Sequence, residues 1–286
     1  MALHKLIATG KQSLKHLVDA MDRPALRPVV GVAATGWATA RYRRSCRVRW
    51  ADGMWTHTYS DLTIPGQPPG RAPSPEKFLA EVDEVFTYAY RVKPGDVVFD
   101  VGAGIGAETL AFSRAAGPTG KVVSIEAHPG TFAMLRSLCQ LNGLGNVTPL
   151  DIAAADAEGE LIITDVTDHV TNSVMSNDAT DGARVKARRL DAVAEELGVD
   201  HIDFLKVNIE GAEVLALPGM GSLIDRTANV CISCHDFLAD QGGSDAMRTK
   251  AFVRGFLTDH GFAVISRDDS PKPWIRDYLY GARSSA

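Results

Sequence analysis

The residues best suited to binding a ligand form a short acid-and-glycine segment near the middle of the chain. Three glycines follow an acid at alternate positions: Asp100, Gly102, Gly104 and Gly106. An apolar run at 97–101 precedes them and predicts a strand, and the residues after them predict a helix. Glycines let the backbone turn tightly and let a ligand approach closely, and the helix directs the positive end of its dipole at the same place. The segment therefore predicts a ligand-binding turn between a strand and a helix.

A second acid supports a nucleoside-containing cofactor. Glu126 ends the next predicted strand, 20 residues after Gly106, where a carboxylate can accept hydrogen bonds from both hydroxyls of a ribose. The glycines also fit loosely the fingerprint of nicotinamide enzymes, Gly102-x-Gly104-x-x-Ala107. The acid before the turn favours another ligand, because a carboxylate attracts an ammonium or sulfonium and repels a pyrophosphate. This spacing resembles motif I of class I S-adenosylmethionine-dependent methyltransferases. A turn without a ligand is the structural alternative.

Candidates for acid–base chemistry follow the predicted strands 203–208 and 229–234. His235 comes directly after the second of these, at the carboxyl edge of the expected sheet, where ligands bind in open α/β folds. An ordinary pKa of ~6.5 suits a general base at neutral pH; the alternative is a buried, hydrogen-bonded residue at a strand end. Glu210 lies in the turn after the first strand and can face an acceptor or a cofactor ammonium. A buried ion pair explains Lys206 as well as a catalytic role does.

Strands and helices are expected to alternate from residue 96 onward, which is typical of a mostly parallel sheet with helices on both faces. The expected strands are 97–101, 121–126, 146–153, 160–164, 203–208 and 229–234, and the expected helices are 106–116, 129–141, 190–197 and 246–260. Residues 262–267 and 277–281 are expected to form a closing hairpin. A further helix is expected from Pro75 to about Tyr90, with Ser74 as its N-cap.

Three further segments resemble the FkbM-type family of class I methyltransferases. Residues 203–213 read D-F-L-K-V-N-I-E-G-A-E, close to the family pattern L-K-[ILV]-D-[VI]-E-G-x-E. The stretch 146–159 and the residues 189–191 fit as well, so that the resemblance covers about residues 80–265. It implies a Rossmann-like fold with a mostly parallel seven-stranded sheet, S-adenosylmethionine as methyl donor, and methylation of hydroxyls on sugars, glycolipids or glycosylated natural products.

The resemblance also implies roles for individual residues. Cofactor contacts are carried over to Asp100, Gly102, Gly104 and Gly106, ribose binding to Glu126, and adenine binding to the backbone near Ala153. Asn172 and Ser173 match a loop that often faces the acceptor.

One position departs from the family pattern, which usually has Asp where this chain has Asn208. An amide is not a base and is a weaker metal ligand, but it can orient a hydroxyl by hydrogen bonds. Glu210 and His235 therefore become the better candidates for acid–base work, and we assign no metal site.

Composition excludes several classes of protein. The chain has 286 residues, of which 45% are hydrophobic and 23% charged, which is ordinary for a globular protein and not for a disordered, collagen-like or polytopic membrane protein. Four cysteines exclude a disulfide scaffold, and we interpret Cys231 and Cys234 as small core residues. The first 50 residues hold ten basic and two acidic side chains, which gives them a net charge of +8. Because the net charge of the whole chain is −5, the remaining residues carry −13. Such a chain does not have the charge profile of a nucleic-acid-binding protein.

We expect two parts, a basic N-terminal extension at 1–73 and a catalytic domain at 74–286. The extension is expected to contain an amphipathic helix at 3–21, an apolar run at 28–40 that is too short to span a bilayer, a hairpin at 45–63 and a linker at 64–75. Its basic surface predicts peripheral contact with an anionic membrane or a partner enzyme, and the alternative is a helix packed on its own domain. The expected location is the cytoplasm, at the membrane surface if the extension binds lipid.

The function that these features favour is S-adenosylmethionine-dependent O-methylation of a hydroxyl on a small-molecule or glycan acceptor. The alternatives are methylation of nitrogen or of a non-sugar hydroxyl, an NAD-linked oxidoreductase, and a non-catalytic methyltransferase-like adaptor.

Overall fold

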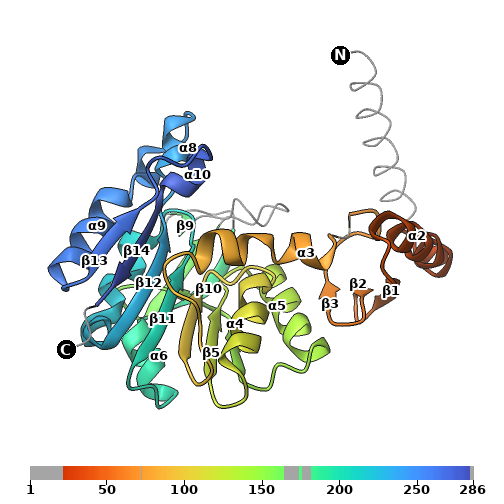
Figure 1. Ribbon diagram of the computed structural model, residues 1–286, viewed down its shortest axis with the longest axis horizontal. Coiled ribbons are helices and arrows are strands. Elements are labelled where there is room, and N and C mark those ends of the chain that lie inside the picture. The colour runs from red at the N-terminus through yellow and green to blue at the C-terminus, as the bar shows by residue number, and fades with distance from the viewer. Residues whose placement is uncertain (1–21, 72, 164–173, 176–181, 284–286) are drawn as a thin grey trace. The chain divides into compact units, whose positions relative to one another are not determined.

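The computed structural model describes residues 22–71, 73–163, 174–175 and 182–283 (Figure 1). The expected helix at 3–21 and the pair Asn172–Ser173 lie outside these residues. The chain divides into two compact units: Met1–Phe78 with Gln140–Asn142, and Leu79–Cys139 with Gly143–Ala286. Each unit contains sheet structure of its own.

The first unit packs one helix on a three-stranded antiparallel sheet. Its elements are α2 (Arg27–Tyr42), β1 (Arg47–Ala51), β2 (Met54–Thr58), β3 (Thr63–Pro65) and the short α3 (Pro75–Phe78). The expected hairpin is confirmed, because β1 and β2 pair antiparallel with Trp50 opposite Trp55. Asp52 and Gly53 have φ of 51° and 80°, as a two-residue hairpin turn requires. A Cβ on Gly31 would lie 2.9 Å from the carbonyl oxygen of Val48, so glycine permits the close packing of α2 on β1.

The second unit is built on a seven-stranded sheet with the order β13-β14-β12-β11-β4-β5-β6. In that order the strands are Ala263–Ser266, Tyr278–Ala282, Thr227–Ser233, Ile202–Val207, Val97–Val101, Lys121–Ile125 and Val147–Leu150. The strands from β12 to β6 pair in parallel, and β14 runs antiparallel to both of its neighbours. The expected mostly parallel sheet and its closing hairpin are confirmed.

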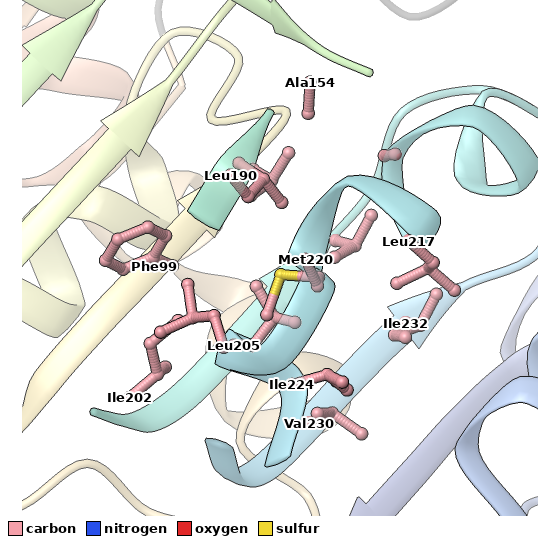
Figure 2. Packing of buried hydrophobic residues seen from close by; sticks show 14 of the residues in the cluster. Phe99, Ala154, Leu190, Ile202, Leu205, Leu217, Met220, Ile224, Val230 and Ile232 are labelled. Atoms are coloured by element: carbon pink, nitrogen blue, oxygen red, sulfur yellow. The ribbon is translucent and has the colours of Figure 1, made fainter. Parts of the chain in front are cut away.

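Helices cover both faces of this sheet, because successive residues of each strand point to opposite sides. Phe99 of β4 packs in a core with residues of α6 (Leu190–Glu196), the 3₁₀ helix η2 (Pro218–Arg226) and α9 (Lys250–Asp259). Figure 2 shows Leu217, Met220 and Ile224 in this core, with Leu205 and Ile232 of the sheet. On the other face, Val98 packs with residues of η1 (Val82–Phe86), α4 (Ala107–Ala116) and α10 (Pro273–Arg276).

A smaller four-stranded sheet lies in the same unit, with the order β7-β10-β8-β9. Its strands are Ile152–Ala154, Ala183–Arg188, Gly159–Ile163 and Val174–Met175. The single strand expected at 146–153 is wrong, because the chain leaves the main sheet at the exposed Asp151 and continues as β7 in this second sheet.

The helix expected from Pro75 to about Tyr90 is confirmed over most of its length, but it is interrupted at Leu79 and ends at Phe86. Ser74 Oγ accepts from the amide of Lys77 at 3.3 Å, as a cap should, but α3 ends at Phe78. Val82–Phe86 is a π-helix, because the amide and the hydroxyl of Thr87 both donate to the carbonyl of Val82, at 2.9 and 3.0 Å.

The helix expected at 246–260 begins later than the sequence indicates. A 3₁₀ turn, η3 (Asp245–Met247), comes first, and α9 begins at Lys250. The carboxylate of Asp236 accepts from the amides of Thr249 and Lys250, both at 3.0 Å, and so fixes this start. The remaining helices are α5 (Pro129–Leu141), α7 (Glu213–Ala216) and α8 (Asp236–Asp240).

Candidate functional site

The glycine turn lies at the centre of the sheet's carboxyl edge, between β4 and α4. The amides of Gly102 and Ala103 both donate to the carbonyl of Ile125 at the end of β5, at 2.9 Å. The amide of Asn208, after β11, donates to the carbonyl of Val101 at 3.0 Å. A Cβ on Gly102 would lie 1.9 Å from the carbonyl oxygen of Asn208. Glycine is therefore required here so that the ends of the two strands can meet.

A buried ion pair stabilises the glycine turn. Lys206 Nζ lies 2.9 Å from Asp100 Oδ1, and both side chains are almost completely buried. Thr109 donates to the other oxygen of Asp100 at 2.6 Å, and Lys206 also donates to the carbonyl of Gly102 at 2.7 Å. Burial acts to lower the pKa of Lys206, but Asp100 and Glu108 raise it above its ordinary value, so the ammonium stays charged. Lys206 therefore links the acid to the backbone of the turn.

The surroundings of Asp100 bear on its predicted contact with a cofactor. Its carboxylate has no exposed surface and is occupied by Lys206 and Thr109. A direct contact stays a prediction, and what the structure shows is an indirect action on Gly102 through Lys206.

Glu126 joins the end of β5 to the turn. One carboxylate oxygen accepts from the amide of Gly104 at 2.9 Å and the other from the amide of His128 at 2.9 Å. Burial raises the pKa of Glu126, and these two amides oppose that rise. Gly104 has a φ of +56° and nothing lies within 4 Å of the place where its Cβ would be, so the turn has an open side. An open glycine beside a carboxylate fits a cofactor that carries a ribose.

The third glycine of the motif has a packing role. A Cβ on Gly106 would lie 2.8 Å from Cδ1 of Leu135 and 3.1 Å from Cδ2 of Leu138, both on α5. Gly106 therefore lets α5 pack tightly against the turn.

Ala153 lies beside the end of β5, far from it in sequence. It is buried in β7, where it packs in one cluster with Ile163 and Val185, and Ala127 borders the same cluster. Because Ala127 follows Glu126, the structure brings the predicted adenine position next to the predicted ribose position.

The segment after β11 adopts a left-handed turn. Glu210 and Gly211 have φ of 53° and 92°, and a non-glycine residue in this region costs about 1–2 kcal/mol. Such strain is often found where a side chain serves a function. Asn208 Oδ1 is buried and has no hydrogen-bond partner among the described residues. An oxygen of this kind is suited to accept a hydrogen bond from a bound ligand.

His235 is held between two carboxylates. Its Nε2 lies 3.6 Å from Glu210 Oε1, and its Nδ1 lies 3.3 Å from Glu213 Oε1. Burial acts to lower the pKa of His235, but Glu210 and Glu213 raise it to about 9. The two carboxylates therefore favour the protonated ring, which argues against His235 as the general base.

Glu108 is a further candidate residue of the site, and it was not expected from the sequence. It lies in the first turn of α4, and burial raises its pKa to about 7, while Lys206 opposes the rise. The signal for it was available, since a carboxylate two residues after Gly106 lies at the helix N-terminus that follows the turn.

Cys231 and Cys234 are free and buried, which confirms their interpretation as core residues. Within the described ranges, no group of three or more His, Cys, Asp or Glu side chains could hold a metal ion. No helix among the described residues is long and apolar enough to cross a membrane.

The strand order, with the glycine turn at the centre of the sheet, is that of a class I S-adenosylmethionine-dependent methyltransferase, whose methyl donor is S-adenosylmethionine. The family model described as the methyltransferase FkbM domain matches residues 100–264. The chain therefore belongs to the FkbM methyltransferase family.

A curated relative is the AMB antimetabolite synthetase AmbE of Pseudomonas aeruginosa, 29% identical over 233 residues. The match covers 66% of this chain and 10% of the relative, so the chain spans only about a tenth of that protein. Among solved structures, the methyltransferase FkbM of Methylobacillus flagellatus is 18% identical, with a TM-score of 0.49 over 73% of this chain and 50% of the other. The fibrillarin of Aeropyrum pernix, solved with natively bound S-adenosyl-L-methionine, is 14% identical, with a TM-score of 0.43 over 82% and 96%.

Proposed function

We propose that this methyltransferase methylates a hydroxyl group on a sugar, a glycolipid or a glycosylated natural product. The observation that supports this acceptor is the group of hydrogen-bond acceptors after β11. Asn208 Oδ1 and one oxygen of the buried Glu213 have no hydrogen-bond partner among the described residues, and Glu210 is only partly covered. A hydroxyl donates to such oxygens, and a sugar carries several hydroxyls on one face.

The chain's task is to bind and orient, because S-adenosylmethionine supplies a methyl group that its sulfonium has already activated. We propose that Glu126 accepts the ribose hydroxyls and that the backbone near Ala153 borders the adenine. The open side of Gly104 would face the methionine part. Asp100 would act through Lys206 by holding the turn, as the ion pair and the bond to Gly102 indicate.

The acceptor hydroxyl has to release its proton as the oxygen attacks. We propose that Glu210 accepts this proton and that Asn208 orients the hydroxyl through Oδ1. His235 would position Glu210 and balance its charge, because the ring lies between Glu210 and the fully buried Glu213. Base assistance of this kind is worth about 10²–10⁴-fold in rate.

The proposal is tested by methyl transfer from labelled donor to a panel of glycosides, glycolipids, non-sugar alcohols and amines, with the methylated atom identified in the product. We expect O-methylated glycosides. Glu210→Gln should reduce kcat about 10²-fold and leave the affinity for S-adenosylmethionine unchanged, because it removes the base and not the cofactor contacts. Glu195→Gln, at an exposed position of α6, serves as the matched control. Methylation of amines alone, or of non-sugar alcohols alone, would overturn the sugar assignment.

A second candidate follows from Asn208, which stands where the family pattern has Asp. A non-catalytic adaptor would keep the cofactor site and lack turnover. Cofactor binding without methylation of any acceptor class would favour this candidate over the enzyme.

The cytoplasm is the location that we propose for this activity. All four cysteines are free and buried, and free thiols are typical of reducing compartments. The expected membrane or partner contact of the basic N-terminal residues is a separate question from catalysis.

A further inference from the structure

Helix α2 has one buried face and one exposed apolar face. Val30, Gly31, Ala34 and Ala38 are its buried residues. The opposite side, here named the α2 outer face, is exposed and carries Val29, Val32, Ala33, Gly36, Trp37 and Ala40. Val32 is 75% exposed, Val29 64% and Trp37 42%, which are large values for apolar side chains. Singly exposed apolar residues need no explanation, but a contiguous apolar face indicates an interaction site.

Basic residues stand at both ends of this face, and Asp22, the acid next to Arg23 in sequence, pairs with Arg27. Residues 23–51 contain seven arginines and no Asp, Glu or Lys. Arg23 precedes the helix, Arg41 lies in its last turn and Arg43 follows it, and all three are exposed. Among the residues that the structure describes, none of these three arginines forms an ion pair. Arg27 and Arg44, in contrast, are paired with Asp22 and with Asp61 and Glu76.

We propose that the α2 outer face lies flat on the surface of an anionic lipid membrane. An apolar stripe between positive charges is the pattern of an interfacial helix, which inserts its apolar side between headgroups while its basic side chains meet lipid phosphates. Trp37 is suited to the boundary between headgroups and acyl chains, since indole combines an apolar ring with one donor. This inference goes beyond the proposed methyl transfer, because it concerns a surface in the first unit.

The charged and apolar residues of the α2 outer face argue against a second copy of the chain and against nucleic acid as its binding partner. A second copy packed through the same face would bring arginines toward arginines, which is unfavourable across a symmetric contact. Nucleic acid would satisfy the arginines, but it offers no partner for Val29 and Val32. An anionic bilayer satisfies both the charges and the apolar stripe.

The proposal is tested with the full-length protein and sedimented vesicles, either of phosphatidylcholine alone or of phosphatidylcholine with phosphatidylglycerol. We expect binding to the anionic vesicles that weakens at high salt. Val32→Asp should reduce the vesicle partition coefficient about tenfold or more, because a charge on the apolar side opposes insertion. Ile265→Asp is the matched control, since Ile265 is 51% exposed on β13 in the second unit, and it should bind as the unaltered protein does. Arg41→Gln combined with Arg43→Gln should weaken binding to the anionic vesicles and leave binding to neutral vesicles unchanged.

Other outcomes would overturn the proposal. These are no binding to anionic vesicles at low salt, or equal binding by Val32→Asp and the unaltered protein. A dimer that Val32→Asp dissociates, without any vesicle binding, would assign the face to a second copy instead. Circular dichroism and the affinity for S-adenosylmethionine should be unchanged in every variant, because the substituted side chains are exposed and lie outside the cofactor site.

Discussion

At the scale of single residues, the site depends on charges that the fold brings together from distant parts of the chain. Asp100 and Lys206 are 106 positions apart and form a buried pair at 2.9 Å. Lys206 also donates a hydrogen bond to the carbonyl of Gly102. Asp100, which the sequence assigns to ligand binding, therefore also helps to hold the backbone of the turn. The strand alternation could predict that Lys206 is buried, but not which acid it meets.

Replacing Lys206 with methionine should be strongly destabilising. Lys206→Met leaves the carboxylate of Asp100 buried and unpaired, which costs about 3–5 kcal/mol of unfolding free energy. The double variant Asp100→Asn/Lys206→Met should regain part of this loss, because the remaining amide carries no charge. Both variants should bind S-adenosylmethionine at least about tenfold more weakly, since the bond to Gly102 is lost in each. Denaturant unfolding and calorimetric titration measure the two effects, and unchanged affinity in the double variant would contradict the assigned role of Lys206.

His235 should make stability depend on pH in a defined window. Its pKa is about 9 in the folded protein and ~6.5 when unfolded, so its stabilising contribution is complete below about pH 6.5 and is lost as the pH rises to about 9. A shift of this size corresponds to about 3 kcal/mol. His235→Asn should lack this part of the pH dependence. The measurement is the unfolding free energy of both proteins between pH 6 and 9.5, and parallel curves would show that the carboxylates do not hold a proton on His235.

At the scale of elements, the main sheet could be predicted and the smaller sheet could not. The strands β4, β5, β11 and β12 are short, mostly apolar runs, and each was expected within one or two residues of its observed bounds. The four-stranded sheet depends on pairings such as β7 with β10, whose residues are more than 30 positions apart and carry no distinctive local pattern. The π-helix at Val82–Phe86 also has no signal in the periodicity of its residues.

The glycine turn supports a paired test at this scale. Gly102→Ala should disrupt the fold and abolish cofactor binding, because its Cβ would overlap the carbonyl of Asn208. Gly104→Ala should fold with a loss of about 1–2 kcal/mol, because alanine is strained at positive φ. It should also bind S-adenosylmethionine about tenfold more weakly, because the methyl group occupies the open side of the turn.

Gly143→Ala controls for the backbone strain alone. Gly143 has a φ of +62° and, like Gly104, nothing lies near the place of its Cβ, but it is remote from the turn in sequence. We expect a similar loss of stability and unchanged cofactor affinity, measured by thermal unfolding and calorimetry. Equal affinities of Gly104→Ala and Gly143→Ala would show that the open side of Gly104 does not face the cofactor.

At the scale of the whole molecule, the excess positive charge and the candidate catalytic site belong to different units. The positive charge of the first 50 residues contrasts with the −13 carried by the remainder. The glycine turn, Glu126 and the Glu210–His235–Glu213 cluster all belong to the second unit, and the α2 outer face belongs to the first. Composition alone could predict this separation of charge. The identity of the acceptor molecule could not be predicted, because no residue pattern in the chain specifies it.

The most direct test of the account is a calorimetric titration of the full-length protein with S-adenosylmethionine, its demethylated product and NAD. We expect micromolar binding of both sulfur compounds, no binding of NAD, and loss of the sulfur-compound binding in Gly102→Ala and Glu126→Ala. Absence of binding by either sulfur compound, or binding of NAD in their place, would contradict the assignment of the glycine turn to the methyl donor.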